Sequence, residues 1–393
     1  MTAKLTYQHT IYAGYVGYIT QAIVNNLAPL LFLIFQDSMG IPLQRITFLI
    51  TANFCIQLLV DLLSARFVDR IGYRVCVVAA HLLCAAGLVG MAAFPVIFAN
   101  AYAGLLAAVV LYAVGGGLIE VLVSPIVEAC PTESKSAAMS LLHSFYCWGT
   151  VAVVLLSTGY LALFGKGSWR LLCCLWAIVP LGNTLLFSRV PIASLTEENG
   201  GMSLRELVSQ KMFWLFLLLI VASGASEQAM SQWASAFAER GLGVSKAVGD
   251  LAGPCFFSLL MGFARAFYAK HSEKLDLLTA IIASGFLCVA AYLLAVFAPV
   301  DALSLVGCGL CGLSVGILWP GVFSVASAHF PKGGTALFAL LALGGDLGCS
   351  GGPTLVGLVA GGLGDNLKAG LAAALVFPMA LILCAVICKR RRS

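Results

Sequence analysis

Long apolar runs separated by short polar or charged segments organise the chain of 393 residues. Each run has about 20 residues or more, the length that an α-helix needs to cross the hydrocarbon core of a bilayer. The runs lack the period-two alternation that a strand barrel requires. The pattern therefore predicts an all-α integral membrane protein with twelve transmembrane helices. The expected spans are residues 10–36, 44–68, 75–98, 102–130, 137–163, 170–190, 211–238, 247–269, 276–298, 302–329, 334–361 and 367–388.

One longer polar connection, residues 191–210, separates the first six spans from the last six. We expect residues 1–190 to form an N-terminal six-helix bundle, residues 191–210 a cytoplasmic linker, and residues 211–393 a C-terminal six-helix bundle. The two halves repeat several features in the same order, which is typical of transporters built from parallel repeats. The repeated features are amides in spans 1 and 7, a glycine followed by a proline in spans 4 and 10, and Phe67, Arg70 and Arg74 after span 2 against Phe267, Lys270 and Lys274 after span 8.

Composition and charge agree with a membrane protein. Hydrophobic residues make up 61% of the chain and charged residues 10%, whereas a soluble domain has roughly 45 to 50% apolar residues. The formal charge of +5 is distributed over the ends of apolar runs, so the lipid bilayer and not nucleic acid is the expected partner. With both termini inside, the cytoplasmic segments hold 16 of the 22 Lys and Arg residues. This bias predicts a location in the cell inner (cytoplasmic) membrane with both termini in the cytoplasm.

The fourteen cysteines do not indicate a disulfide framework or a metal site. They are scattered singly, and the pair Cys308 and Cys311 lies inside an apolar span without nearby His or Cys partners. We interpret them as small packing residues. The sequence also lacks a Walker loop, a zinc-ligand spacing and a Gly-x-Ser-x-Gly elbow. We therefore expect a monomeric protein that is not an enzyme and that uses neither a cofactor nor a metal.

An acid inside an apolar run is the strongest functional signal. Glu120 lies in the run 111–131, roughly 11 residues or about 16 Å from its polar end. A carboxyl group at this depth is costly and marks a solute or ion pathway by default. We expect Glu120 to contact a small-molecule solute and to carry the coupling ion, H+. The alternative is a permanently protonated acid that is bonded to a neighbouring helix.

Four segments carry a resemblance to a known family. The sequence Arg66-Phe-Val-Asp-Arg-Ile-Gly-Tyr-Arg74 resembles the Asp-Arg-x-Gly-x-Arg loop of the major facilitator superfamily. Gly117-Leu-Ile-Glu120, the segment 143–149 and Asn25-Asn26-Leu27 are similar to the fucose-permease and related sugar:proton symporter branch. This resemblance implies two pseudo-symmetric six-helix bundles whose spans 1, 4, 7 and 10 line a central cavity. It also implies that Glu120 acts in proton coupling with a span-1 aspartate, but Ala28-Pro29 stands where that acid would fall.

Amide and aromatic side chains complete the expected binding face. Gln21 and Asn25 are four residues apart and share a helix face, as do Gln228 and Gln232. Amides donate and accept, which suits a polyhydroxylated neutral ligand. The alternative is hydrogen bonding between helices, worth about 0.6 kcal/mol per bond in membranes. The expected substrate-binding residues are Gln21, Asn25, Asn26, Glu120, His143, Tyr146, Glu227, Gln228, Gln232, Trp233 and Trp319.

Further charged residues fall into three groups. Glu227 and Asp346 lie near mid-depth and are candidates for proton coupling beside Glu120, although the glycines around Asp346 also suit close helix packing. Asp61 and Arg265, near inner helix ends, are interpreted as side chains that reach towards the interface. At the cytoplasmic ends we expect an ionic lock that holds the outward-open state. Its residues are Asp69, Arg70, Arg74, Glu128 and Glu133.

Together these patterns predict a secondary active transporter that moves a small polar, sugar-like solute by proton-coupled symport and alternating access. Two alternatives stay open. One is a proton-coupled antiporter that exports cationic or amphipathic compounds, because Glu120 and Glu227 can each pair with a cation. The other is a non-transporting membrane receptor or lipid-handling protein.

Overall fold

A computed structural model describes residues 5–131, 135–193, 202, 204–271 and 276–392, with backbone alone for some helical residues. All regular secondary structure in these residues is helical, as the apolar runs predict. Eleven helical stretches in the described residues are long and apolar enough to cross a membrane. The span expected at 334–361 coincides with helix α16 (Gly334–Gly362), several of whose side chains are not described. The count of twelve membrane spans therefore stays a prediction.

The chain divides into two compact units, residues 1–197 (unit 1) and residues 198–393 (unit 2). The division falls inside the polar connection that the sequence places at 191–210. A short helix, α8 (Leu204–Ser209), forms within this connection and buries Leu207. The amphipathic segment of the linker is thus folded against unit 2.

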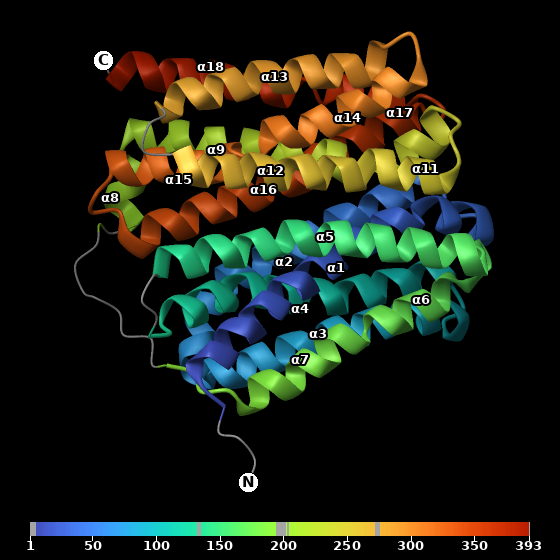
Figure 1. Ribbon diagram of the computed structural model, residues 1–393, viewed down its shortest axis with the longest axis horizontal. Helices are drawn as coiled ribbons and strands as arrows, with labels where there is room; N and C mark the ends of the chain where they lie inside the picture. Colours follow the sequence, from blue (N-terminus) through green and yellow to red (C-terminus); the bar gives the residue numbers. More distant parts are fainter. Residues whose placement is uncertain (1–4, 132–134, 194–201, 203, 272–275, 393) are drawn as a thin grey trace. The chain divides into compact units, whose positions relative to one another are not determined.

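Long helices make up unit 1 (Figure 1). Each follows one of the first six apolar runs, and the sixth run is divided by a turn around Ala177. The elements are α1 (Tyr7–Met39), α2 (Leu43–Ile71), α3 (Tyr73–Ile97), α4 (Ala101–Glu128), α5 (Lys135–Phe164), η1 (Lys166–Ser168), α6 (Trp169–Trp176) and α7 (Ile178–Arg189).

Very short connections fix the directions of α2, α3 and α4. Gly72 alone joins α2 to α3, and its φ of 94° lies in a region that glycine adopts readily. Residues 98–100 join α3 to α4, and the Asn100 side chain caps α4 by accepting from the N–H of Tyr102 at 2.9 Å. Such connections make consecutive helices antiparallel. The helices α2 and α4 therefore run in the same direction.

Unit 2 has more interrupted helices. The seventh apolar run breaks after Ser231 and continues through a short π-helix, and the tenth run breaks at Gly316. The elements are α9 (Lys211–Ser231), α10 (Ala234–Ala236), η2 (Phe237–Gly241), α11 (Lys246–Asp250), η3 (Leu251–Cys255), α12 (Phe256–His271), α13 (Leu277–Phe297), α14 (Asp301–Val315), α15 (Leu318–His329), α16, α17 (Leu367–Ala373) and α18 (Val376–Arg392).

Helices α9 and α16 lie side by side in unit 2 (Figure 1). Their backbones approach so closely that a Cβ atom added at Gly348 would lie 2.0 Å from the carbonyl oxygen of Val221. A Cβ atom added at Gly224 would lie 2.5 Å from the carbonyl oxygen of Gly345. Glycine removes this conflict, which is how small residues allow membrane helices to associate. The glycine-rich stretch around Asp346 is therefore a helix contact.

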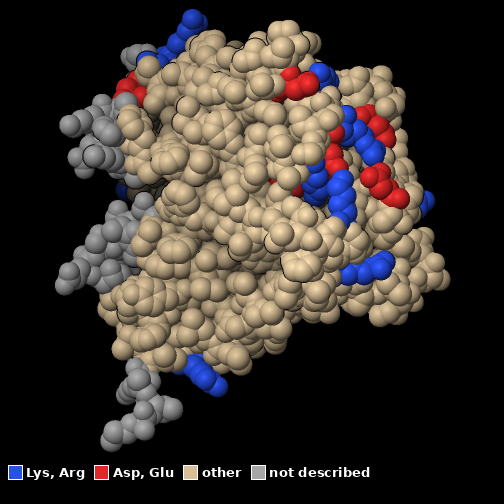
Figure 2. Space-filling model, turned by 45° about the vertical axis from the view of Figure 1, so that its right-hand side comes forward, with Lys and Arg blue, Asp and Glu red and all other residues tan. Residues whose placement is uncertain are grey.

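The outer surface suits a lipid environment. Figure 2 shows a face on which large areas carry no charged side chain, while Lys, Arg, Asp and Glu gather near its edges. Large apolar side chains are exposed, such as Leu163 at 81% and Phe286 at 60%. Extensive apolar exposure marks a membrane or partner surface. The surface therefore agrees with a multi-pass membrane protein.

Candidate functional site

In unit 1, Glu120 of α4 lies in contact with buried amide side chains. Gln21 of α1 donates from Nε2 to Glu120 Oε2 at 3.1 Å and to Gln57 Oε1 of α2 at 3.2 Å. No basic side chain in the described part of the chain pairs with Glu120. Because α4 ends at Glu128, Glu120 lies about 12 Å before the helix end, somewhat shallower than its distance from the end of the apolar run suggests. An amide, and not a cation, thus holds this carboxyl group.

The contact continues as a cluster of four amides, Gln21, Asn25, Asn53 and Gln57, which we call the amide cluster. Gln57 Nε2 donates to Asn25 Oδ1 at 2.9 Å and to Asn53 Oδ1 at 3.0 Å, and Asn53 Nδ2 donates to Asn25 Oδ1 at 3.3 Å. Each of the four side chains is at most 7% exposed. Buried polar groups need such partners. The amide cluster therefore joins α1 and α2 beside the carboxyl group of α4.

Sequence reasoning missed Asn53 and Gln57. Their four-residue spacing in an apolar helix, continued by Asp61, is the same signal that singled out Gln21 and Asn25. The family resemblance points to spans 1, 4, 7 and 10 and not to span 2. The α2 helix supplies half of the amide cluster.

A second contact joins α1 to α5. Asn26 Nδ2 donates to Thr150 Oγ1 at 3.2 Å and lies 3.5 Å from the hydroxyl of Tyr146. The structure thus brings Asn26 and Tyr146 together, as expected for members of one site. His143 is exposed, and its ring stands edge-on to Tyr18 with centroids 5.1 Å apart. These placements put both α5 residues beside α1, while their role in binding stays a prediction.

In unit 2, Glu227 of α9 forms an ion pair. Its Oε2 lies 3.7 Å from Nη2 of Arg265 on α12, and its Oε1 accepts from Gln228 Nε2 at 3.3 Å. Gln232 Nε2 in turn donates to Gln228 Oε1 at 3.1 Å. The interpretation of Arg265 as a side chain that reaches towards the interface is wrong, because this side chain is only 19% exposed and pairs with Glu227. The charge of Glu227 is therefore balanced within its own unit.

Both candidate tryptophans of unit 2 contact α16. Trp233 is fully buried, and its Nε1 donates to the carbonyl oxygen of Pro353 at 2.9 Å. Trp319 is partly exposed, and its ring covers Gly345, where an added Cβ atom would lie 2.1 Å from Cη2 of the indole. Asp346, the next residue on α16, is 6% exposed. These contacts hold helices together, and a sugar-stacking role for either ring stays a prediction.

The comparison with protein families decides the identity of the fold. The sequence model of the family described as the Major Facilitator Superfamily matches residues 14–353 of this chain. The chain belongs to the Major Facilitator Superfamily. No curated protein matches the sequence. Members of this superfamily are membrane transporters that generally act as carriers without enzymatic activity.

Solved structures of the superfamily share the fold. A bacterial homologue of the human lysosomal transporter Spinster, in an inward-facing and occupied conformation, matches with a TM-score of 0.75 at 14% identity, over 98% of this chain and 97% of that chain. The E. coli fucose:proton symporter matches with a TM-score of 0.66 at 17% identity, over 98% and 99% of the two chains. A D-xylose–proton symporter matches with a TM-score of 0.75 at 12% identity, over 97% and 96%. At these identities the likeness shows the fold alone.

In the superfamily loop between α2 and α3, Arg74 contacts the end of α7. Arg74 donates from Nη1 to the carbonyl oxygen of Phe187 at 2.9 Å and from Nη2 to that of Val190 at 2.8 Å. It thereby binds the last carbonyl groups of α7, where cations are favoured. Arg70 is exposed. The expected acidic members of the lock, Asp69, Glu128 and Glu133, have side chains outside the described residues, so the lock stays a prediction.

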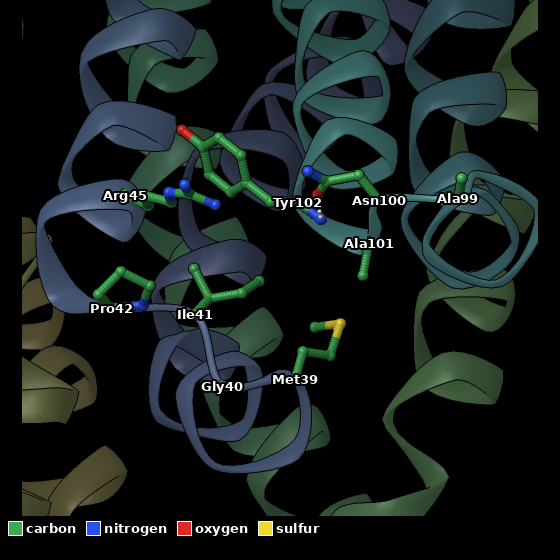
Figure 3. A pocket seen from close by; sticks show the side chains of 9 residues that line it. All are labelled: Met39, Gly40, Ile41, Pro42, Arg45, Ala99, Asn100, Ala101 and Tyr102. Carbon is green, nitrogen blue, oxygen red and sulfur yellow. Dashed lines mark hydrogen bonds between the residues drawn. The ribbon is translucent and has the colours of Figure 1, made fainter.

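A hollow of about 300 Å³ opens at the other end of α4 from Glu120. It lies where α1 ends, α2 begins and α3 connects to α4, and the guanidinium of Arg45 lies 5.3 Å from the centre of the Tyr102 ring (Figure 3). None of the residues that the sequence predicts for substrate binding lines it. This hollow is therefore distinct from the candidate site.

Proposed function

We propose that this superfamily member is a secondary active transporter that moves a small polar, sugar-like solute by alternating access, coupled to protons as a symporter. The observation that carries the proposal is the Glu120 carboxyl group, which lies within α4 and contacts Gln21 at 3.1 Å without a basic partner in the described residues. Acids in such positions form proton relays in transporters, because they exchange a proton when water reaches them.

The amides and hydroxyls at the contact between α1 and α5 support a neutral, polyhydroxylated solute. Asn26, Thr150 and Tyr146 combine amide and hydroxyl groups at the α1–α5 contact, and such groups both donate and accept. The fucose:proton and D-xylose–proton symporters among the structural matches support the same solute class. The Spinster homologue has an equally similar fold, so the fold by itself does not select a solute.

The ion pair of unit 2 weakens the alternative of a cation exporter. That alternative relies on two acids, Glu120 and Glu227, that are free to bind a cationic compound. Glu227 already pairs with Arg265 at 3.7 Å, so binding a cation there requires that this pair open. Symport of a neutral solute needs no such step.

Transport by the purified protein in liposomes tests the proposal. Vesicles that contain a pH-sensitive dye are given an inward proton gradient together with a panel of neutral hexoses and pentoses and one cationic dye. We expect one sugar to accumulate while the lumen acidifies. The variant Glu120→Gln should lose accumulation yet still exchange labelled for unlabelled sugar, whereas Asp301→Asn, an exposed acid at the start of α14, should behave as wild type.

Two results would contradict the proposal. Undiminished proton-driven accumulation in Glu120→Gln would remove Glu120 from coupling. Movement of the cationic dye against the proton flow, without movement of any sugar, would favour the exporter.

A further inference from the structure

Asp61 of α2 continues the polar stripe that Asn53 and Gln57 begin. It lies four residues after Gln57 and eight after Asn53, so it is on the same helix face, one turn further along. Its side chain is partly buried and its Oδ1 atom is enclosed by protein. Gln57 bonds to Gln21, which bonds to Glu120. Asp61 is therefore the next polar group after the amide cluster on the side of α2 that faces the candidate site.

The contact between α2 and α4 fixes the level at which Asp61 lies. At Gly117 of α4, an added Cβ atom would lie 3.0 Å from Cβ of Val60 and 3.1 Å from Cα of Gln57. The two helices run in the same direction, as their short connections through α3 require. Glu120 comes three residues after Gly117, and Asp61 comes four residues after Gln57. Both acids are thus about one turn beyond this close contact, at the same depth on neighbouring helices.

The electrostatic surroundings agree with this placement. At this placement the charge of Asp61 acts on the Glu120 carboxyl group, which accepts a hydrogen bond from Gln21. Other titratable groups on the helices around α4 have their own described contacts: Tyr18 of α1 with Ser124, His81 of α3 with Asn183, and His143 of α5 with Tyr18. The side chains of Arg66, Asp69 and Glu128, further along α2 and α4, are outside the described residues.

The side-chain amide of Gln21 can form a hydrogen bond with the Glu120 carboxyl group whether that group is protonated or ionised. Its Nε2 donates to Glu120, as a carboxylate requires, while its Oε1 is buried and has no hydrogen-bond partner among the described residues. A side-chain amide that rotates presents this oxygen to an O–H group. The unpartnered acceptor therefore points to a donor that is present for part of the transport cycle, and the hydroxyl of a protonated carboxyl group is such a donor.

We propose that Asp61 and Glu120 form one proton site, in which a single proton is held between a carboxyl group of α2 and a carboxyl group of α4. Two adjacent negative charges in a medium of low dielectric constant repel strongly, and one shared proton relieves that repulsion. The existence of this shared site is independent of the proposed function. Only the statement that its proton drives transport rests on the proposed function.

A spectroscopic test needs no solute, so it stays informative if the proposed function fails. Infrared difference spectra of the reconstituted protein, taken between acidic and alkaline buffer, report the C=O stretch of protonated carboxyl groups. Subtracting the spectra of variants from the wild-type spectrum isolates the bands of Asp61 and Glu120. We expect the double variant Asp61→Asn with Glu120→Gln to lose one protonated-carboxyl band. The single variant Asp61→Asn should shift the frequency of that band, and Asp301→Asn, the matched control, should leave it unchanged.

Three results would overturn the shared site. The first is a band that keeps its position and intensity in Asp61→Asn. The second is a pair of bands that titrate independently in the wild-type protein. The third is loss of the band when sodium chloride replaces choline chloride, because sodium would then occupy the site. If Asp61→Asn does not fold, Asp61→Glu keeps the carboxyl group but displaces it by one methylene group, which should still shift the band, and an unchanged frequency in that variant contradicts the proposal.

A transport measurement separates this inference from the proposed function. With a transported sugar, Asp61→Asn should lose proton-driven accumulation and keep exchange, as Glu120→Gln does. If Glu120→Gln loses accumulation and Asp61→Asn keeps it, the proposed function stands and Asp61 is not part of the proton site. If no sugar is transported while the infrared band responds to both residues, the shared site stands and the proposed solute class is wrong.

Discussion

Each unit places a glutamate beside buried amide side chains, but the surroundings of its charge differ between the two units. In unit 1, Glu120 accepts a hydrogen bond from Gln21 at 3.1 Å, and the proposed shared site places another acid, Asp61, beside it. In unit 2, Glu227 lies 3.7 Å from the guanidinium of Arg265. A neighbouring acid favours the protonated form of a carboxyl group, whereas a neighbouring base favours its ionised form.

This difference narrows the choice of proton carrier. An ion pair compensates its own charge, and removal of either partner leaves the other uncompensated in a medium of low dielectric constant. Glu120 has no basic partner in the described residues, and in the proposed function a proton balances its charge. We infer that Glu120 is the mobile proton carrier and that Glu227 has a mainly structural role. The predictions below test this contrast through stability.

The largest effect is expected for Arg265→Met, which removes the cation of the Glu227 ion pair and keeps an unbranched, largely apolar side chain. The carboxyl group of Glu227, a residue that is only 7% exposed, then loses the arginine that balances its charge. We expect a loss of about 3 kcal/mol in the free energy of unfolding, the lower end of the range for a broken buried pair, because Arg265 is 19% exposed. Thermal unfolding of the purified protein in detergent measures it. A melting temperature equal to that of wild type would show that the pair has no structural role.

Removing both charges should restore most of this loss. In the double variant Arg265→Met with Glu227→Gln, no uncompensated charge is left, and Gln228 can still donate to the new amide oxygen. We expect stability within about 1 kcal/mol of wild type, measured by the same melt. A double variant as unstable as Arg265→Met alone would mean that the arginine stabilises unit 2 through other contacts.

Much of the fold follows directly from the sequence, because polar residues bound each apolar run. The span expected at 75–98 is observed as Tyr73–Ile97, and the span expected at 276–298 as Leu277–Phe297. The interruptions at Gln232 and Gly316 were not predicted. They depend on contacts with other helices, such as the bond from Trp233 to Pro353, which local periodicity does not report.

The candidate site was predictable only in part for the same reason. Glu120 and Gln21 stand out as polar residues in apolar runs, and the structure brings them into contact. The partner of Glu227 is 38 positions away on another helix, and no pattern within one helix identifies it. Asn53 and Gln57, by contrast, are polar residues four positions apart in an apolar run. This spacing within one helix is enough to identify them from the sequence.

An intermediate effect is expected for Gln57→Leu, which tests whether unit 1 depends on hydrogen bonds as unit 2 depends on charge. The change removes the hydrogen bonds of Gln57 with Asn25 and Gln21, and it removes the donor to the buried Oδ1 atom of Asn53. Unsatisfied buried polar groups cost about 1 to 3 kcal/mol, so the melting temperature should fall. Gln44→Leu, an exposed position on the same helix, is the control and should change stability by less than about 0.5 kcal/mol. Equal effects of the two changes would argue against a structural role for the amide cluster.

The smallest effect on stability is expected where the effect on transport is largest. Glu120→Gln keeps the shape of the side chain, and its carbonyl oxygen still accepts from Gln21. Since no basic partner in the described residues loses its counter-charge, we expect a change of less than about 0.5 kcal/mol, typical of substitutions that disturb no buried charge pair. Glu227→Gln, the matched change in unit 2, leaves Arg265 without its acid and should lower the melting temperature clearly. If the two isosteric changes destabilise the protein equally, then Glu120 also compensates a charge, and the contrast between the two glutamates does not hold.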